Sequence, residues 1–167
     1  TLRRVGGQFA VAADGIRFYR DGPLKSIALE TNVHPGFMTD LQPPFVLLLS
    51  QAEGMSVVHE TVFEDRFGYV AALHQMGADM ALYDACLGGA PCRFHSSNYK
   101  HSCVIKGPMR LHGARITVPD LRAGFTYLIA AVLAEGQSTI QGLSHIERGY
   151  ENLEDSLRCL GVQIDKG

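Results

Sequence analysis

The sequence lacks the features of three broad protein classes. Its 167 residues hold 15 Lys and Arg against 17 Asp and Glu, and a formal net charge of −2 argues against a basic nucleic-acid binder. The longest purely apolar run, residues 128–134, is far shorter than the roughly 20 residues that span a bilayer. The first residues show no secretory signal pattern. We therefore expect no nucleic acid or membrane as partner, and a cytoplasmic location.

Several chemical motifs are also missing. The chain has no G-x-x-x-x-G-K-[ST] phosphate loop, no G-x-G-x-x-G fingerprint and no G-x-S-x-G nucleophile elbow. Its four cysteines include no C-x-x-C pair, and we expect them to be reduced thiols. The spacing of Cys86, Cys92, His95, His101 and Cys103 fits no standard zinc site. We therefore expect no cofactor and no metal.

What the sequence does contain is an internal repeat. The pattern L-x-x-h-G-x-x-h, where h is apolar, occurs at residues 2–9, 73–80 and 157–164. Such a pattern predicts an amphipathic helix that ends at a glycine in the left-handed conformation, followed by a strand. A repeated supersecondary unit is the simplest explanation for three copies.

A second set of matches gives the repeat its length. Glu53 and Glu135 lie 82 residues apart, as do Arg66 and Arg148, and each glutamate follows an apolar helix and precedes a β-like run. We predict one domain over residues 1–167, in which 1–36 end a first repeat, 37–118 form a second with an insertion at 81–113, and 119–167 form a third. On this interpretation the chain begins inside a repeat and is part of a longer protein.

The local patterns give further expectations. Thr39-x-x-Gln42 has the form of a capping box, followed by Pro43 and Pro44 in the first helical turn. Residues 103–106 and 114–118 are the firmest strand predictions of the 81–118 region. Core-facing helical stripes are expected at three sets of positions: 41, 45, 48, 49 and 52; 121, 125, 128, 129, 132 and 133; and 150, 153, 157 and 160.

Charged residues at the helix starts are the candidates for chemistry. Asp40 and Asp120 occupy equivalent places, where an aspartate also serves as an ordinary N-cap. Three arginines lie near helix starts, where the helix dipole disfavours cations but backbone N–H groups favour anions: Arg66, Arg122 and Arg148. They form either an anion site or surface ion pairs with residues 64, 65 and 147, and the sequence leaves both open.

Four segments carry a family resemblance. FMTDLQ (37–42), HETVFEDRF (59–67), PDLRA (119–123) and HIERGY (145–150) resemble, in the same order, segments of the enolpyruvyl transferases that act on UDP-N-acetylglucosamine. The similarity extends from about residue 2 to residue 164. It implies an α/β fold of repeated βαβαββ units forming one domain of an inside-out α/β barrel, with the first repeat truncated.

The resemblance also implies roles for individual residues. Asp40 matches the carboxylate that takes the proton from the sugar 3-hydroxyl, and Val62 matches a residue whose backbone contacts the sugar nucleotide. Asp120 matches an acidic residue near the reacting centre. The arginines at 66, 122 and 148 match those that hold the phosphate and carboxylate of phosphoenolpyruvate. The implied activity is transfer of the enolpyruvyl group to UDP-N-acetylglucosamine, the first committed step of peptidoglycan synthesis.

The departures from the family pattern set limits on this interpretation. The family's Lys-Asn pair and its mobile loop with a Cys or Asp general acid belong to an N-terminal domain that the sequence does not contain, so we expect the chain alone to be inactive. Met38 replaces the usual Pro, and the 81–113 segment is longer than in common members. Two alternatives stay open: a non-catalytic module that binds a nucleotide sugar or a protein, and an enolpyruvyl transferase for another acceptor.

Overall fold

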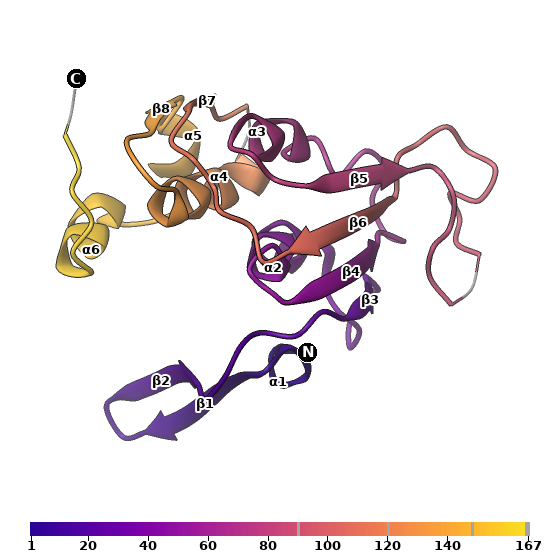
Figure 1. Cartoon of the computed structure of the whole chain (residues 1–167), viewed down its shortest axis with the longest axis horizontal. Coiled ribbons are helices and arrows are strands. Elements are labelled where there is room, and N and C mark those ends of the chain that lie inside the picture. Colours follow the sequence, from indigo (N-terminus) through magenta and orange to yellow (C-terminus); the bar gives the residue numbers. More distant parts are fainter. Residues whose placement is uncertain (90, 120, 148, 166–167) are drawn as a thin grey trace.

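A computed structural model describes residues 1–89, 91–119, 121–147 and 149–165. The chain begins with helix α1 (Leu2–Val5) and a hairpin of strands β1 (Gly7–Ala12) and β2 (Gly15–Arg20), which pair in antiparallel register. The hairpin extends away from the remaining elements (Figure 1), and every residue of β2 is exposed.

The central unit has the predicted order β-α-β-α-β-β. Strand β3 (Ala28–Glu30) leads through a 3-10 turn, η1 (Thr39–Leu41), to helix α2 (Gln42–Leu49) and strand β4 (Gly54–His59). Helix α3 (Val70–Gln75) and strands β5 (Met80–Tyr83) and β6 (Ser102–Gly107) follow. The sheet order is β3-β4-β6-β5, with β3 parallel to β4 and the other pairs antiparallel. The expected α/β repeat is confirmed for this unit.

The next unit begins in the same way. Strand β7 (Arg115–Thr117), helix α4 (Leu121–Leu133) and strand β8 (Thr139–Gln141) repeat the order of β3, α2 and β4, and β7 pairs with β8 in parallel register. Two short helices follow, α5 (Ser144–Glu147) and α6 (Leu153–Cys159). Residues 162–164, where the repeat predicts a strand, have no regular structure, so this part of the prediction was wrong.

Equivalent hydrogen bonds confirm the internal repeat. The N–H of Glu53 donates to the carbonyl of Leu24 at 2.8 Å, and the N–H of Glu135 donates to Leu111 at the same distance. Each bond fixes the segment before a unit's first strand beside the turn that follows that unit's first helix. The 82-residue sequence spacing therefore reflects one structural plan used twice.

The three glycines of the repeated pattern adopt the predicted conformation. Gly6, Gly77 and Gly161 have φ of 97°, 90° and 89°, and each follows the last turn of a helix. Because only glycine adopts this left-handed conformation at little energetic cost, the helix ends can be recognised from the sequence.

The capping-box prediction was wrong. Thr39 does not cap the helix, because its hydroxyl donates to Glu60 Oε2 at 2.9 Å. Gln42 is fully buried and accepts a hydrogen bond from the hydroxyl of Tyr69 at 3.1 Å. Tertiary contacts thus take both side chains away from the helix end. The prolines do lie in the first turn of α2, as expected.

The helical stripes were only partly right. Leu49 and Ala52 are fully buried, but Leu41 is exposed. On α4 the predicted Leu128 is buried, together with residues 123, 126, 127 and 130, which the stripe did not include, whereas Val132 and Leu133 are exposed. On α6 only Leu157 of the predicted stripe is buried, and Leu160 is 80% exposed.

Helix α4 joins the two units. It packs against α2 and α3 of the central unit and against α5 of its own (Figure 1). The turn before α3 and the start of α4 therefore lie side by side, and this junction holds the candidate site. Within the described ranges, no helix has the length and apolar character that crossing a membrane requires.

Replacing Gly77 with alanine tests the repeat's helix end. Gly77→Ala places a Cβ at φ +90° and 3.2 Å from the ring of His112, so we expect a loss of about 1–2 kcal/mol of folding free energy, measured by urea denaturation. Gly22→Ala is the control, because its Cβ meets nothing within 4 Å, and we expect a change within about 0.5 kcal/mol. Equal effects at the two positions contradict the argument.

Candidate functional site

The structure brings two of the predicted site residues into direct contact. Arg66 Nη2 lies 2.7 Å from Asp40 Oδ1, although 26 residues separate them. The Arg66 side chain is only 7% exposed, whereas Asp40 is 83% exposed. Arg66 thus pairs with Asp40, while Glu64 pairs with Arg93 at 2.9 Å.

The Arg66 guanidinium keeps a free donor. Its Nε is buried and has no hydrogen-bond partner among the described residues. The guanidinium carbon lies 5.9 Å from the centre of the Phe63 ring, which holds the group against an aromatic face. A buried cation with an unused N–H is well suited to bind an anion.

A small cavity opens beside Arg66. Its volume is about 130 Å³, and it lies between the turn before α3 and the start of α4. The lining combines ring faces with charged groups: Pro43, Phe63, Glu64, Asp65, Arg66, Gly68, Tyr69, Pro119, Ala123 and Tyr127. Residues from 63–69 and from 119–127 therefore meet at one cavity, and the family resemblance places Arg66 and Arg122, from the same two regions, at one site.

The remaining predicted residues are only partly described. Arg122 belongs to the first turn of α4, between cavity residues Pro119 and Ala123, but its side chain is outside the description. Asp120 and Arg148 lie outside the described residues. Their roles stay predictions. Val62 is half-buried, and its N–H donates to Glu60 Oε1 at 2.9 Å.

Glu60 is the residue that the sequence reasoning missed. Its fully buried carboxylate accepts four hydrogen bonds. They come from the hydroxyls of Thr31 (2.8 Å) and Thr39 (2.9 Å) and from the N–H groups of Val62 (2.9 Å) and Phe63 (3.0 Å). A buried carboxylate is tolerated only when its lone pairs are filled in this way.

The Glu60 network determines where the site residues lie. Thr39 and residues 62–63 all bind to the two oxygens of the Glu60 carboxylate. Thr39 is the neighbour of Asp40, and residues 62–63 lead to Arg66, so the network holds both site residues near each other. The sequence carried a signal for this role, because Glu60 lies inside the matched segment HETVFEDRF. Its acidic character alone did not distinguish it from a surface glutamate.

The Cys/His residues divide into two groups. His59, Cys86, Cys92 and His101 have side-chain ligand atoms within 4.8 Å of one another. His95 is exposed, and Cys103 is buried in β6, where burial raises the pKa of its thiol to about 12. Burial lowers the pKa of His59, against the opposing effect of Glu30. The sequence analysis did not connect His59 with the cysteines.

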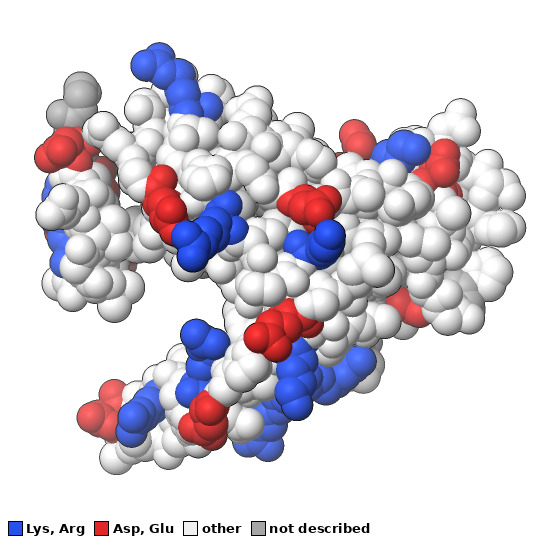
Figure 2. Space-filling model, in the orientation of Figure 1, with Lys and Arg blue, Asp and Glu red and all other residues white. Residues whose placement is uncertain are grey.

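Charge over the molecule is mixed rather than concentrated. On the face shown in Figure 2, acidic side chains lie among the basic ones. The Asp40–Arg66 pair differs from the surface ion pairs because its arginine side chain is almost completely buried. For comparison, both members of the Arg93–Glu64 pair are more than half exposed.

Comparison with solved structures first defines the class of fold. The chain superimposes on the enolpyruvyl transferase NikO from Streptomyces tendae with a TM-score of 0.82 and 29% identity, over 98% of this chain and 34% of that one. It also matches EPSP synthase from Acinetobacter baumannii with a TM-score of 0.59 at 16% identity, which shows a shared fold only. The expected enolpyruvyl transferase fold is thereby confirmed.

Sequence comparison then gives the family. The family model for EPSP synthase (3-phosphoshikimate 1-carboxyvinyltransferase) matches residues 1–157, and the chain belongs to this family. The UDP-N-acetylglucosamine 1-carboxyvinyltransferase of Protochlamydia amoebophila is 56% identical over 164 residues, and that of Chlamydia abortus is 49% identical over 166. Each alignment covers 98% of this chain but only 35% and 37% of the relative, so the chain spans about a third of their length.

Glu60→Gln tests the network. The neutral amide presents an NH₂ group to donors that need an acceptor, so we expect a loss of about 1–3 kcal/mol of folding free energy by chemical denaturation. Glu64→Gln is the matched control, because Glu64 makes only an exposed pair with Arg93, and we expect a change within about 0.5 kcal/mol. A Glu60→Gln protein as stable as its parent contradicts the proposed function of this carboxylate in holding the site together.

Proposed function

We propose that this chain is part of an enzyme that transfers the enolpyruvyl group of phosphoenolpyruvate to the 3-hydroxyl of UDP-N-acetylglucosamine and releases phosphate. The observation that carries the proposal is the contact between an exposed carboxylate, Asp40, and a buried guanidinium, Arg66, at the edge of a small cavity. The names of the relatives at 48–56% identity support the choice of acceptor.

In this proposal Asp40 is the general base. Its carboxylate is 83% exposed, so a sugar hydroxyl can approach it, and Arg66 orients it through Oδ1. The base must come within hydrogen-bond reach of the proton that it accepts. The covalent step then balances: Asp40 takes the hydroxyl proton, the sugar oxygen bonds to C2 of phosphoenolpyruvate, and C3 gains a proton from an acid elsewhere in the protein.

The second half of the reaction releases phosphate. The C2–O bond to the phosphate breaks, phosphate leaves with the electron pair, and a proton leaves C3 to restore the double bond. Negative charge grows on the departing group, and preorganised cations stabilise it. In this proposal the guanidinium of Arg66 fills that role through its unused Nε–H, together with Arg122 and Arg148.

Further residues complete the proposed site. The backbone of Val62 contacts the sugar nucleotide, and Glu60 supports this by fixing the direction of the Val62 N–H. Asp120 orients the neighbouring arginines. We also propose that the reaction serves peptidoglycan synthesis in the cytoplasm, as the resemblance to the cell-wall branch of the family implies.

Asp40→Asn tests the base. In the full-length enzyme we expect kcat to fall by about 10²–10⁴-fold, because an amide cannot accept the hydroxyl proton. Phosphate release with saturating phosphoenolpyruvate and UDP-N-acetylglucosamine measures it, and calorimetry checks that binding of the sugar nucleotide is retained. Asp14→Asn, in the exposed turn of the β1–β2 hairpin, is the control and should keep full activity. If Asp40→Asn retains its parent's kcat, the base lies elsewhere.

The share of the relatives' length that the chain covers gives another prediction. Because the chain spans about a third of those enzymes, we expect it to release no phosphate alone and to regain turnover when the remaining two thirds are supplied. Shikimate 3-phosphate replaces the sugar nucleotide in a parallel assay. Turnover by the chain alone contradicts the proposal that the active site needs the rest of the enzyme. Turnover with shikimate 3-phosphate but not with the sugar nucleotide contradicts the proposed acceptor. A reconstituted protein without turnover favours a non-catalytic binding module.

A further inference from the structure

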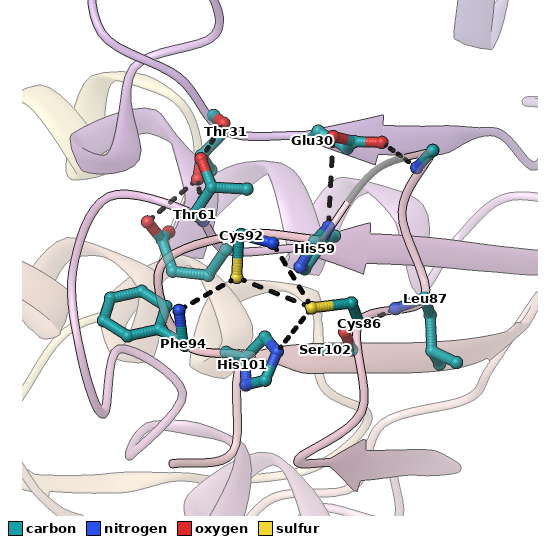
Figure 3. A network of polar contacts seen from close by, with 12 residues as sticks. Glu30, Thr31, His59, Thr61, Cys86, Leu87, Cys92, Phe94, His101 and Ser102 are labelled. Carbon is teal, nitrogen blue, oxygen red and sulfur yellow. Dashed lines mark hydrogen bonds and ion pairs between the residues drawn. The ribbon is translucent and has the colours of Figure 1, made fainter. Parts of the chain in front are cut away.

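Outside the proposed active site, four potential metal ligands converge at the end of strand β4. His59 ends that strand, Cys86 and Cys92 lie in the loop of residues 84–101, and His101 directly precedes β6. Their ligand atoms all lie within 4.8 Å of one another, and Figure 3 shows the two sulfur atoms between the two imidazole rings. Three separate stretches of chain therefore contribute to one compact cluster.

Two of the distances between ligand atoms match the edges of a zinc-centred tetrahedron. Cys86 Sγ lies 3.7 Å from Cys92 Sγ and 3.4 Å from His101 Nε2. With Zn–S of about 2.3 Å and Zn–N of about 2.0–2.1 Å, tetrahedral angles require S···S of about 3.8 Å and S···N of about 3.5 Å. The observed distances agree with these edges to within about 0.1 Å.

His59 supplies independent evidence for a ligand. It is fully buried, yet neither ring nitrogen has a hydrogen-bond partner among the described residues. Buried polar atoms are rarely left in this state without an ion or water that completes them. In Figure 3, one ring nitrogen faces Glu30 and the other faces the sulfur atoms, so an ion between the sulfurs and His59 satisfies the inward nitrogen.

The groups around the cluster are arranged to support an ion. His101 Nδ1 lies 2.8 Å from the carbonyl of Tyr99, a contact that makes Nδ1 the protonated nitrogen and leaves Nε2 free to bind metal. Glu30 Oε2 lies 3.9 Å from His59 Nδ1 and completes a carboxylate–histidine arrangement. Backbone N–H groups point at both sulfurs, from Phe94 to Cys92 (3.3 Å) and from Cys92 to Cys86 (3.5 Å).

We propose that His59, Cys86, Cys92 and His101 form a structural zinc site. Two thiolates and two imidazoles in tetrahedral positions are the donor set that zinc prefers, and two thiolates neutralise the charge of Zn²⁺ in a buried place. All four positions come from the protein, as in structural rather than catalytic sites. The proposal replaces the expectation of no metal, which rested on ligand spacing along the sequence.

The proposed zinc site attaches the loop of residues 84–101 to the end of strand β4. The loop also reaches β3, because the N–H of Gly89 donates to Glu30, and a Cβ at Gly88 would lie 2.0 Å from His59 Nδ1. His59 immediately precedes Glu60, whose N–H donates to the carbonyl of His101 at 2.7 Å. The ion therefore fixes the start of the segment that leads to Val62 and Arg66.

Metal analysis of the full-length protein, purified without chelators after growth with zinc, tests the site. We expect about one zinc per chain in the parent and in two controls, and loss of at least about nine tenths of it in Cys86→Ser, Cys92→Ser and His59→Ala. The controls are matched: His95→Ala removes an exposed imidazole 3.9 Å from Cys86 Sγ, and Cys159→Ser removes an exposed thiol. Zinc lost from His95→Ala but kept in His59→Ala overturns the ligand set.

A second measurement uses the parent protein and therefore does not depend on the variants being folded. Cobalt is added to the chelator-treated parent, where two thiolate ligands give a sulfur-to-cobalt charge-transfer band and intense tetrahedral d–d bands. We expect both, and zinc should abolish them while protecting Cys86 and Cys92 from alkylation. A parent that binds neither zinc nor cobalt, a disulfide joining Cys86 to Cys92, or full occupancy by another metal overturns the proposal.

Discussion

One buried carboxylate determines how the candidate site is built. Glu60 is fully buried, and its charge is stable there only because two threonine hydroxyls and two backbone N–H groups donate to it. Those donors come from three stretches of chain, so satisfying the carboxylate brings the stretches together. The Asp40–Arg66 contact is a consequence, because Asp40 follows one donor and Arg66 lies three residues after another. The Asp40–Arg66 contact thus depends on a buried group that is not part of the contact itself.

The same strand end connects this network to the proposed zinc site. His59 and Glu60 are consecutive, and their side chains take part in different clusters. The backbone N–H of Glu60 donates to the carbonyl of His101. The backbone of a proposed zinc ligand therefore also holds the residue that carries the buried carboxylate. An ion that orders the 84–101 loop therefore limits motion at Glu60. This residue begins the segment that leads to Val62 and Arg66, which the proposed function assigns to substrate binding. The proposed zinc site gives the long loop of residues 84–101 a structural role.

What the sequence could predict was local. The helix ends at Gly6, Gly77 and Gly161 follow from the conformational freedom of glycine, and the repeat follows from equal spacing, so both were found. Thr39 and Gln42 were misread as a capping box, because a buried acceptor and a tyrosine from elsewhere compete for them. His59 was not grouped with Cys86 because the two lie 27 positions apart along the chain. Contacts of this kind depend on the fold, and no local pattern records them.

The repeat also explains why the site is asymmetric. Arg66 and Arg148 are equivalent at a spacing of 82 residues, but the position equivalent to Glu60 is Gly142, with φ of 81°, and the position equivalent to His59 is Gln141. At these two positions the later unit has a glycine in place of the carboxylate and an amide in place of the imidazole. The two equivalent strand ends therefore differ at two adjacent positions, His59-Glu60 in one and Gln141-Gly142 in the other. The cavity lies between the turn before α3 and the start of α4. The unit of β7, α4 and β8 therefore contributes the start of a helix to the candidate site.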